Sequence, residues 1–136
     1  MPYSRSVDSN GFLITTLQGV VTLKEAIELA DDLHNHIKNG EFFELVLHAD
    51  DVKIALDPNE AEISASTLMG VLKTVKRGGM AFVSNKDVVY GLCRQLQTRA
   101  ENAFFQLCVF RTEDTARAWL HEMCASPLHG EQTRGQ

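Results

Sequence analysis

The chain has 136 residues, of which 44% are hydrophobic and 23% are charged. This length and balance predict one globular domain with a hydrophobic core of its own. The formal net charge is -5 and the pI is about 5.5. Nucleic acids and anionic membranes recruit proteins through clustered Lys and Arg, so the charge argues against both kinds of partner.

The sequence contains no segment with the roughly 20 consecutive apolar residues of a membrane-spanning helix. The N-terminal MPYSRSVDSN lacks the apolar region of a secretory signal, and we therefore expect a cytoplasmic protein. Cys93, Cys108 and Cys124 show none of the paired spacings that metal or redox sites use. We expect reduced, mostly buried thiols, and we expect neither a metal nor another cofactor.

The first third of the chain predicts a hairpin followed by a helix. Asn10-Gly11 separates two strand-like runs, and both residue types tolerate the positive φ of a tight turn. Thr22 and Glu25 have the spacing of a capping box, and apolar residues then recur at helical spacing as far as Ile37. Asn39-Gly40 is a typical helix end.

The middle of the chain predicts two buried strands separated by a helix. The run from Phe42 to Ala49 is nearly all apolar, as in a central strand covered on both faces. Asp57-Pro58-Asn59-Glu60 has the capping residue, the proline and the acid of a helix start. We expect this helix to end at Gly78-Gly79, and Met80 to Val83 to form a short strand.

The last third predicts a helix, a strand and a final helix. Ser84 and Asp87 form a capping pattern before an apolar stripe that ends at Ala100. The apolar run from Phe104 to Phe110 predicts a strand, and Thr112 is placed to cap the helix that follows. We expect this helix to close the core over the sheet with an apolar face of Ala116, Trp119, Leu120 and Met123.

These elements follow one another in the order β-β-α-β-α-β-α-β-α. This order predicts an α/β fold with a single mixed β-sheet and helices packed against it. Strand-helix-strand units make right-handed crossovers, which place consecutive strands parallel. We expect one domain over residues 1–125 and a polar, disordered tail over residues 126–136.

Three strand-to-helix passages carry a resemblance to a known family. They are LQGVVTLKEA (17–26), AFVSNKDVVYGLCRQL (81–96) and VFRTEDTARAWL (109–120). Together with the order of elements over about residues 3 to 124, they resemble the STAS superfamily of anti-sigma-factor antagonists. Within it, the chain is most similar to the small stand-alone SpoIIAA-like bacterial proteins.

The resemblance implies a non-enzymatic module that binds partner proteins. Members of the superfamily are switched by phosphorylation of a serine at the start of the helix after the central strand. In this chain Ala65 occupies the matching position between Ser64 and Ser66, and the Asp-Ser-Ser-Gly pattern is absent. Ser66 is therefore the candidate phosphosite. The superfamily is also compared with Sec14-type lipid-binding domains. Ligand binding in a pocket is therefore an alternative function.

Polar residues after the central strand form a first candidate site. Ligands of open α/β sheets favour the carboxyl ends of the strands, where His48, Asp50 and Asp51 lie in this chain. These residue types suit a metal or an acid/base site. No second set of ligands has a recognisable spacing, however, and a solvated strand-to-loop junction is the commoner outcome.

Two further features could serve binding. Val52, Ile54 and Leu56 either line a pocket or, as is commoner, cover one end of the core. Gly91 lies within an amphipathic helix and invites a close approach, either of that helix to the sheet or of a partner to the helix. With Arg94 it forms a candidate partner surface, although an exposed arginine is more often solvated or ion-paired.

The sequence leaves three functions open, of which we favour the first. It is a cytoplasmic, non-enzymatic regulatory or protein-interaction domain, expected to form a homodimer and to bind a protein partner near residues 48–68. The alternative is a small-molecule or lipid carrier with an apolar cavity near Val52, Ile54 and Leu56. An enzyme that uses His48 comes third, because the chain lacks a nucleophile elbow and a glycine-rich phosphate loop.

Overall fold

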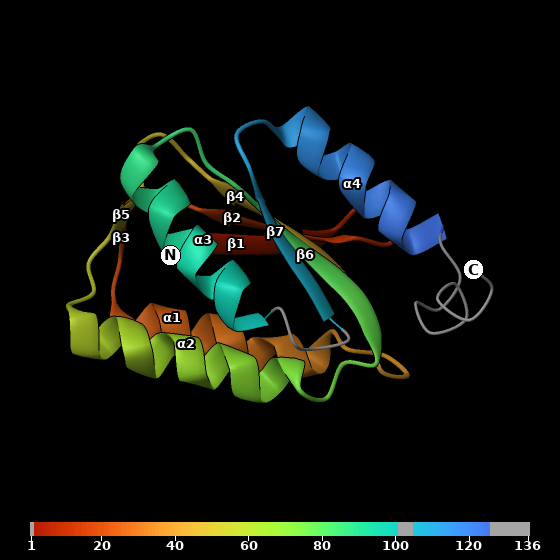
Figure 1. Ribbon diagram of the computed structural model, residues 1–136, viewed down its shortest axis with the longest axis horizontal. Coiled ribbons are helices and arrows are strands. Elements are labelled where there is room, and N and C mark those ends of the chain that lie inside the picture. The colour runs from red at the N-terminus through yellow and green to blue at the C-terminus, as the bar shows by residue number, and fades with distance from the viewer. Residues whose placement is uncertain (1, 101–104, 126–136) are drawn as a thin grey trace.

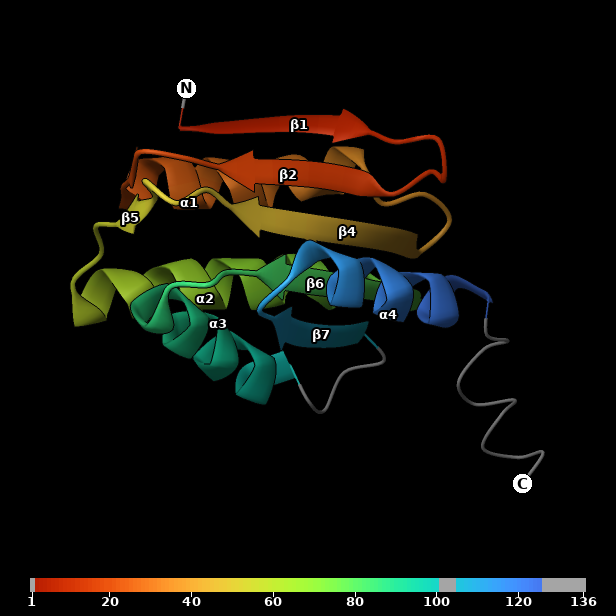
Figure 2. The same cartoon turned by 90° about the horizontal axis from the view of Figure 1, so that it is seen from above.

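The computed structural model describes residues 2–100 and 105–125, so the tail predicted over residues 126–136 lies outside the described residues. Five strands form one mixed sheet in the order β1-β2-β4-β6-β7 (Figure 2). They are β1 (Tyr3–Val7), β2 (Leu13–Leu17), β4 (Glu41–His48), β6 (Arg77–Val83) and β7 (Phe105–Phe110). β1 runs antiparallel to β2, and the other neighbours are parallel, which confirms the predicted mixed α/β sheet.

The described α-helices connect and cover these strands. They are α1 (Leu23–Asp32), α2 (Pro58–Leu72), α3 (Asp87–Ala100) and α4 (Glu113–Ala125). The strands follow one another across the sheet without reversal, so crossovers of one hand place α1, α2 and α3 on the same face. α4 covers the opposite face, where it contacts β6, β4 and β7 (Figure 1).

Short elements add to the predicted order. β3 (Val20–Val21) and β5 (Lys53–Ile54) pair in parallel beyond the carboxyl ends of β2 and β4. A 3-10 turn, η1 (Leu33–Asn35), follows α1, so the α-helix ends earlier than the predicted Asn39-Gly40 stop. Asn39 and Gly40 instead hold positive φ angles of 57° and 75° in the turn that leads into β4.

Local capping sets two helix starts where the sequence predicts them. The Glu25 carboxylate accepts from the backbone N–H of Thr22 at 2.9 Å, at the start of α1. The Glu60 carboxylate accepts from the backbone N–H of Asp57 at 3.0 Å, at the start of α2. Both capping boxes are confirmed, because each depends only on residues three positions apart.

The glycine pair Gly78-Gly79 does not end α2, contrary to the prediction. α2 ends at Leu72, and both glycines are buried inside β6. A Cβ added to Gly79 would lie 3.2 Å from Cη2 of Trp119, so glycine lets the indole of α4 pack directly on the strand. The prediction that this helix closes the core is confirmed, since Ala116 and Leu120 are fully buried.

Alternate residues of each strand serve the two faces of the sheet. The cluster under α4 comprises Phe12, Phe43, Leu45, Ala81, Val83, Ala116 and Leu120. The cluster on the other face joins the sheet to α1, α2 and α3 and includes Leu13, Leu17, Phe42, Val46, Leu72, Met80, Phe82 and Val89. The sheet therefore separates two cores.

The three cysteines differ in exposure. Cys93 is buried, Cys108 is half-buried and Cys124 is exposed, so the expectation of mostly buried thiols is wrong. All three are free, as expected. Burial raises the pKa of Cys93 to about 12, so this thiol is protonated and unreactive at neutral pH.

A candidate ligand-binding cavity

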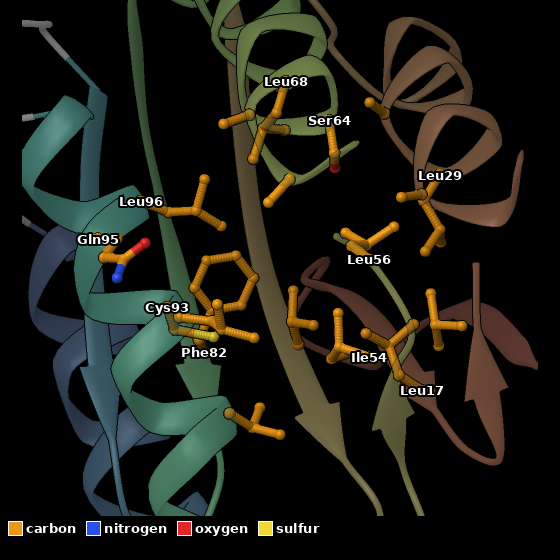
Figure 3. A pocket seen from close by; sticks show the side chains of 18 of the residues that line it. Leu17, Leu29, Ile54, Leu56, Ser64, Leu68, Phe82, Cys93, Gln95 and Leu96 are labelled. Atoms are coloured by element: carbon orange, nitrogen blue, oxygen red, sulfur yellow. The ribbon is translucent and has the colours of Figure 1, made fainter. Parts of the chain in front are cut away.

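A cavity of about 530 Å³ lies between the sheet and the helices α1, α2 and α3. Figure 3 shows Leu68 of α2, Leu96 of α3 and Phe82 of β6 directed toward one space, with Leu56 on its other side. Well-packed protein interiors leave few voids larger than a water molecule. The volume falls in the range of about 300–1,000 Å³ that is typical of small-molecule sites.

The cavity opens between α2 and α3. Its solvent-exposed lining residues all belong to these two helices and are Pro58, Glu62, Gln95 and Arg99. Across this mouth Arg99 Nη1 donates to Glu62 Oε2 at 2.6 Å, and Arg99 Nη2 donates to Ser66 Oγ at 3.4 Å. The hydrogen bond and charge of Arg99 lower the pKa of Glu62. α1 and α2, in contrast, pack closely along each other (Figure 1).

The opposite end of the cavity is polar. Arg5 and Thr15 are register partners on β1 and β2, and Glu44 lies diagonally from Thr15 on β4. Arg5 Nε donates to Thr15 Oγ1 at 2.8 Å, and Arg5 Nη2 donates to Glu44 Oε2 at 3.3 Å. The Thr15 hydroxyl donates to the same oxygen, Glu44 Oε2. All three residues line the cavity.

Arg5 also connects this polar cluster to α1. Its Nη1 donates to the carbonyl oxygen of Leu29 at 2.8 Å and to Asp32 Oδ2 at 2.9 Å. Both acceptors lie in the last turn of the helix, where free carbonyl groups favour a positive charge. Hydrogen bonds from Asn35 and Arg5 lower the pKa of Asp32. The arginine is therefore a fixed part of the cavity wall.

Glu44 is the buried acid of the cluster. Its side chain is 1% exposed, and Oε1 has no hydrogen-bond partner among the described residues. Burial raises the pKa of Glu44, while the charge of Arg5 and the Thr15 hydrogen bond oppose that rise. This end of the cavity therefore holds a carboxyl group that is only half satisfied.

The sequence alone does not predict this cluster. Glu44 is the only acidic residue in the run from Phe42 to Ala49, and an acid in such a run is the signal that could have revealed it. Arg5 and Thr15 carry no comparable signal, because polar residues are common on a strand near a sheet edge.

Comparison with known proteins gives the fold a name. Neither a protein-family model nor a curated protein matches this chain. A solved structure does match it: an uncharacterized protein from the DUF3478 family with a SpoIIAA-like fold, from Shewanella loihica PV-4. The two are 14% identical, the match covers 87% of this chain and 93% of the other, and the TM-score is 0.58. The chain has a SpoIIAA-like fold.

The SpoIIAA-like fold confirms the predicted resemblance at the level of architecture. At this sequence identity the likeness concerns the fold alone, so the chemistry of the cavity must be argued from this chain's own residues. Within the part of the chain that the structure describes, each helix is too short or too polar to span a membrane.

In this SpoIIAA-like fold His48 and the two aspartates have different hydrogen-bond partners. His48 lines the cavity, where Nδ1 donates to the Val83 carbonyl oxygen at 2.9 Å, and burial lowers the pKa of the imidazole. Asp50 and Asp51 are exposed beyond the strand end, where they accept from the Asn85 amide and the Gly19 backbone N–H. The described residues contain no group of three His, Cys, Asp or Glu side chains placed to hold a metal.

The loop after β4 contributes to the cavity only in part. Ile54 and Leu56 line it, whereas Val52 is buried in the core at 1% exposure. Both predicted roles of this segment therefore occur, in different residues. Ser64 lines the cavity, and Ser66 is exposed at the mouth.

The proposed partner surface lies on the outer face of α3 in the SpoIIAA-like fold. Gly91 is exposed, and a Cβ added there would meet nothing within 4 Å. A close approach of the helix to the sheet at Gly91 is therefore wrong for the described residues. Arg94 is exposed and forms no ion pair with a described residue. Its role in binding a partner stays a prediction.

Proposed function

We propose that this protein binds a small, mostly apolar ligand in the cavity between the sheet and α1, α2 and α3. The observation that carries the proposal is the cavity of about 530 Å³ itself, on a sheet face that is otherwise packed. An apolar lining with a few converging polar groups is typical of small-molecule sites. We therefore favour the carrier over the regulatory domain that the sequence favours.

Titration with N-phenyl-1-naphthylamine, a neutral dye that fluoresces in apolar surroundings, tests this proposal. We expect saturable binding of one dye per chain. Ala65 is buried in the cavity wall, so Ala65→Phe should weaken dye binding by about tenfold or more. Ala118→Phe is the matched control, because Ala118 is exposed on α4, on the other side of the sheet. Equal affinity in the two variants would contradict the proposal.

Leu96→Trp provides a second obstruction if Ala65→Phe does not fold. Leu96 extends into the same space from α3 (Figure 3). Native mass spectrometry of the protein from its own cells, before and after denaturation, then identifies the ligand. A released mass of lipid or metabolite size is the expected result, and a bare chain that also fails to bind the dye would overturn the proposal.

A regulatory role is the second candidate, and Ser66 is the observation that favours it. Its hydroxyl is at the mouth, 3.4 Å from Arg99 Nη2. A phosphate on Ser66 would pair with that arginine and so compete with Glu62. Ser66→Glu should alter the rate of dye release relative to Ser66→Gln, the uncharged control. Identical rates in stopped-flow experiments would argue against the switch.

We further propose binding rather than catalysis, and a cytoplasmic location. Binding is supported because His48 bonds to the Val83 carbonyl group and Asp50 to Asn85, so these hydrogen bonds do not join an acid to a base. Three free cysteines suit a reducing compartment. Sedimentation equilibrium, which measures the molar mass in solution, tests the predicted homodimer.

A further inference from the structure

The half-satisfied carboxyl group of Glu44 carries information about the ligand. Oε2 accepts from Thr15 and from Arg5, whereas Oε1 is buried and has no partner among the described residues. In folded proteins buried carboxyl oxygens almost always have a hydrogen-bond partner. Since the described protein supplies none, a group of the ligand is a natural partner for this oxygen.

The position of Glu44 on β4 supports this interpretation. Its neighbours on the same face of the strand, Phe42 and Val46, are buried and apolar. An apolar residue would fill this position without the desolvation that a carboxyl group requires. An acid that lines an apolar cavity and keeps one oxygen unpaired is therefore better explained by recognition than by packing.

A hydroxyl group matches Oε1 in both protonation states of Glu44. When the carboxyl group is ionised, Oε1 accepts and the ligand hydroxyl donates. When it is neutral, Oε2 still accepts two hydrogen bonds, so the proton lies on Oε1 and the ligand hydroxyl accepts.

Charged head groups fit this end of the cavity less well. A carboxylate would add a negative group beside Asp32, and beside Glu44 when Glu44 is ionised, around the single guanidinium of Arg5. An ammonium group would pair only with ionised Glu44 and would lose its own hydration in an apolar cavity.

We propose that the ligand is a neutral amphiphile with a hydroxyl head group. Oε1 has almost no accessible surface, so the hydroxyl binds it after a small turn of the Glu44 carboxyl group toward the cavity. The apolar chain then extends from the end near Arg5 toward the mouth between α2 and α3. This inference rests on the proposed function and deepens it, because it names the chemical class of the ligand.

Three probes with the same ten-carbon chain isolate the head group. We would measure displacement of N-phenyl-1-naphthylamine at pH 7 by 1-decanol, decylamine and sodium decanoate. Decanol should displace the dye at about tenfold lower concentration than either charged probe. The wild-type ranking needs no variant, so the inference stays testable whatever any substitution does to folding.

Glu44→Gln then tests the assignment to one residue. Glutamine keeps a hydrogen-bonding group for the hydroxyl but removes the negative charge, so the preference for decanol over decanoate should fall by about fivefold or more. Glu122→Gln is the matched control, because Glu122 is exposed on α4 on the other side of the sheet, and it should keep the wild-type preference.

The two proposals fail in different ways. If none of the three probes displaces the dye and the dye itself does not bind, the proposed function is wrong. If decanoate or decylamine binds as tightly as decanol, ligand binding stands and the hydroxyl head group is wrong. If Glu122→Gln changes the preference as much as Glu44→Gln does, the assignment to Glu44 is wrong.

Discussion

The two faces of the sheet are built from the same strands but differ in how closely helices approach them. Under α4 the contact involves Gly79, Ala81 and Ala116, whose small side chains let the helix lie directly on the strands. On the other face Met80 and Phe82 point toward α1, α2 and α3, and a cavity remains among them. One glycine and two alanines at the contact thus let α4 lie close to the strands, whereas a cavity remains under the other three helices.

The largest expected effect comes from shortening one leucine side chain on each face of the sheet. Leu120 is fully buried under α4, so Leu120→Ala should reduce the free energy of unfolding by about 2–5 kcal/mol. Leu68 lines the cavity and lacks neighbours on one side, so Leu68→Ala should lose only about 1 kcal/mol. Urea unfolding measures both values. Equal losses would mean that the two faces are equally packed.

Replacing each of two glycines with alanine should change the stability of the protein in opposite directions. Gly79→Ala should destabilise the protein by about 1–3 kcal/mol, because the new methyl group meets the Trp119 ring. The smaller ring of Trp119→Phe should restore part of that loss in the double variant. Gly91→Ala should instead stabilise by about 0.5–1 kcal/mol, since its site in α3 is open. Destabilisation of both variants by the same amount would contradict the contact with Trp119.

The buried carboxyl group at the polar end of the cavity should make the free energy of unfolding depend on pH. The pKa of Glu44 is raised from its ordinary value of 4.5, so the folded protein binds more protons than the unfolded chain above that pH. Wild-type stability therefore falls as pH rises toward the raised pKa, whereas Glu44→Gln lacks this loss.

Urea titrations of both proteins from pH 4 to pH 8 measure this effect. The free-energy difference between variant and wild type should be flat below pH 4.5. Above it, the difference should rise in favour of the variant by at most about 1.4 kcal/mol per pH unit. A difference that does not depend on pH would mean that the carboxyl group is not desolvated.

The smallest expected effect on stability is at the mouth. Arg99→Gln removes an exposed ion pair with Glu62, and such pairs add little to stability, so the urea midpoint should not move. Release of N-phenyl-1-naphthylamine should become a few fold faster, because the link between α2 and α3 is lost. A changed midpoint with an unchanged release rate would place the opening elsewhere.

Elements that depend on near neighbours were predictable from the sequence. Thr22 with Glu25 and Asp57 with Glu60 each locate a helix start through contacts three residues apart. The prediction of a helix end at Gly79 is wrong because the partner of this glycine, Trp119, is remote in the chain. A glycine required by a long-range contact cannot be told from one required by a turn in a single sequence.

The candidate site was predictable only in fragments. The sequence indicates Ile54 and Leu56 as possible pocket residues, and it indicates His48 but not that its side chain lines the cavity. The strand order has no reversal, so the sheet has no switch point where a crevice would form at the strand ends. The cluster of Arg5 and Glu44 depends on three strands meeting in register, which local patterns do not encode.

The placement of α4 has a consequence for synthesis on the ribosome. It is the last described element in the chain, and it packs against Phe43 and Leu45, which are made long before it. Until α4 emerges, the nascent sheet presents these apolar side chains to other molecules, a state prone to aggregation. A chain truncated before Thr112 should therefore be insoluble, and the final helix acts as a cover that protects each new molecule from its neighbours.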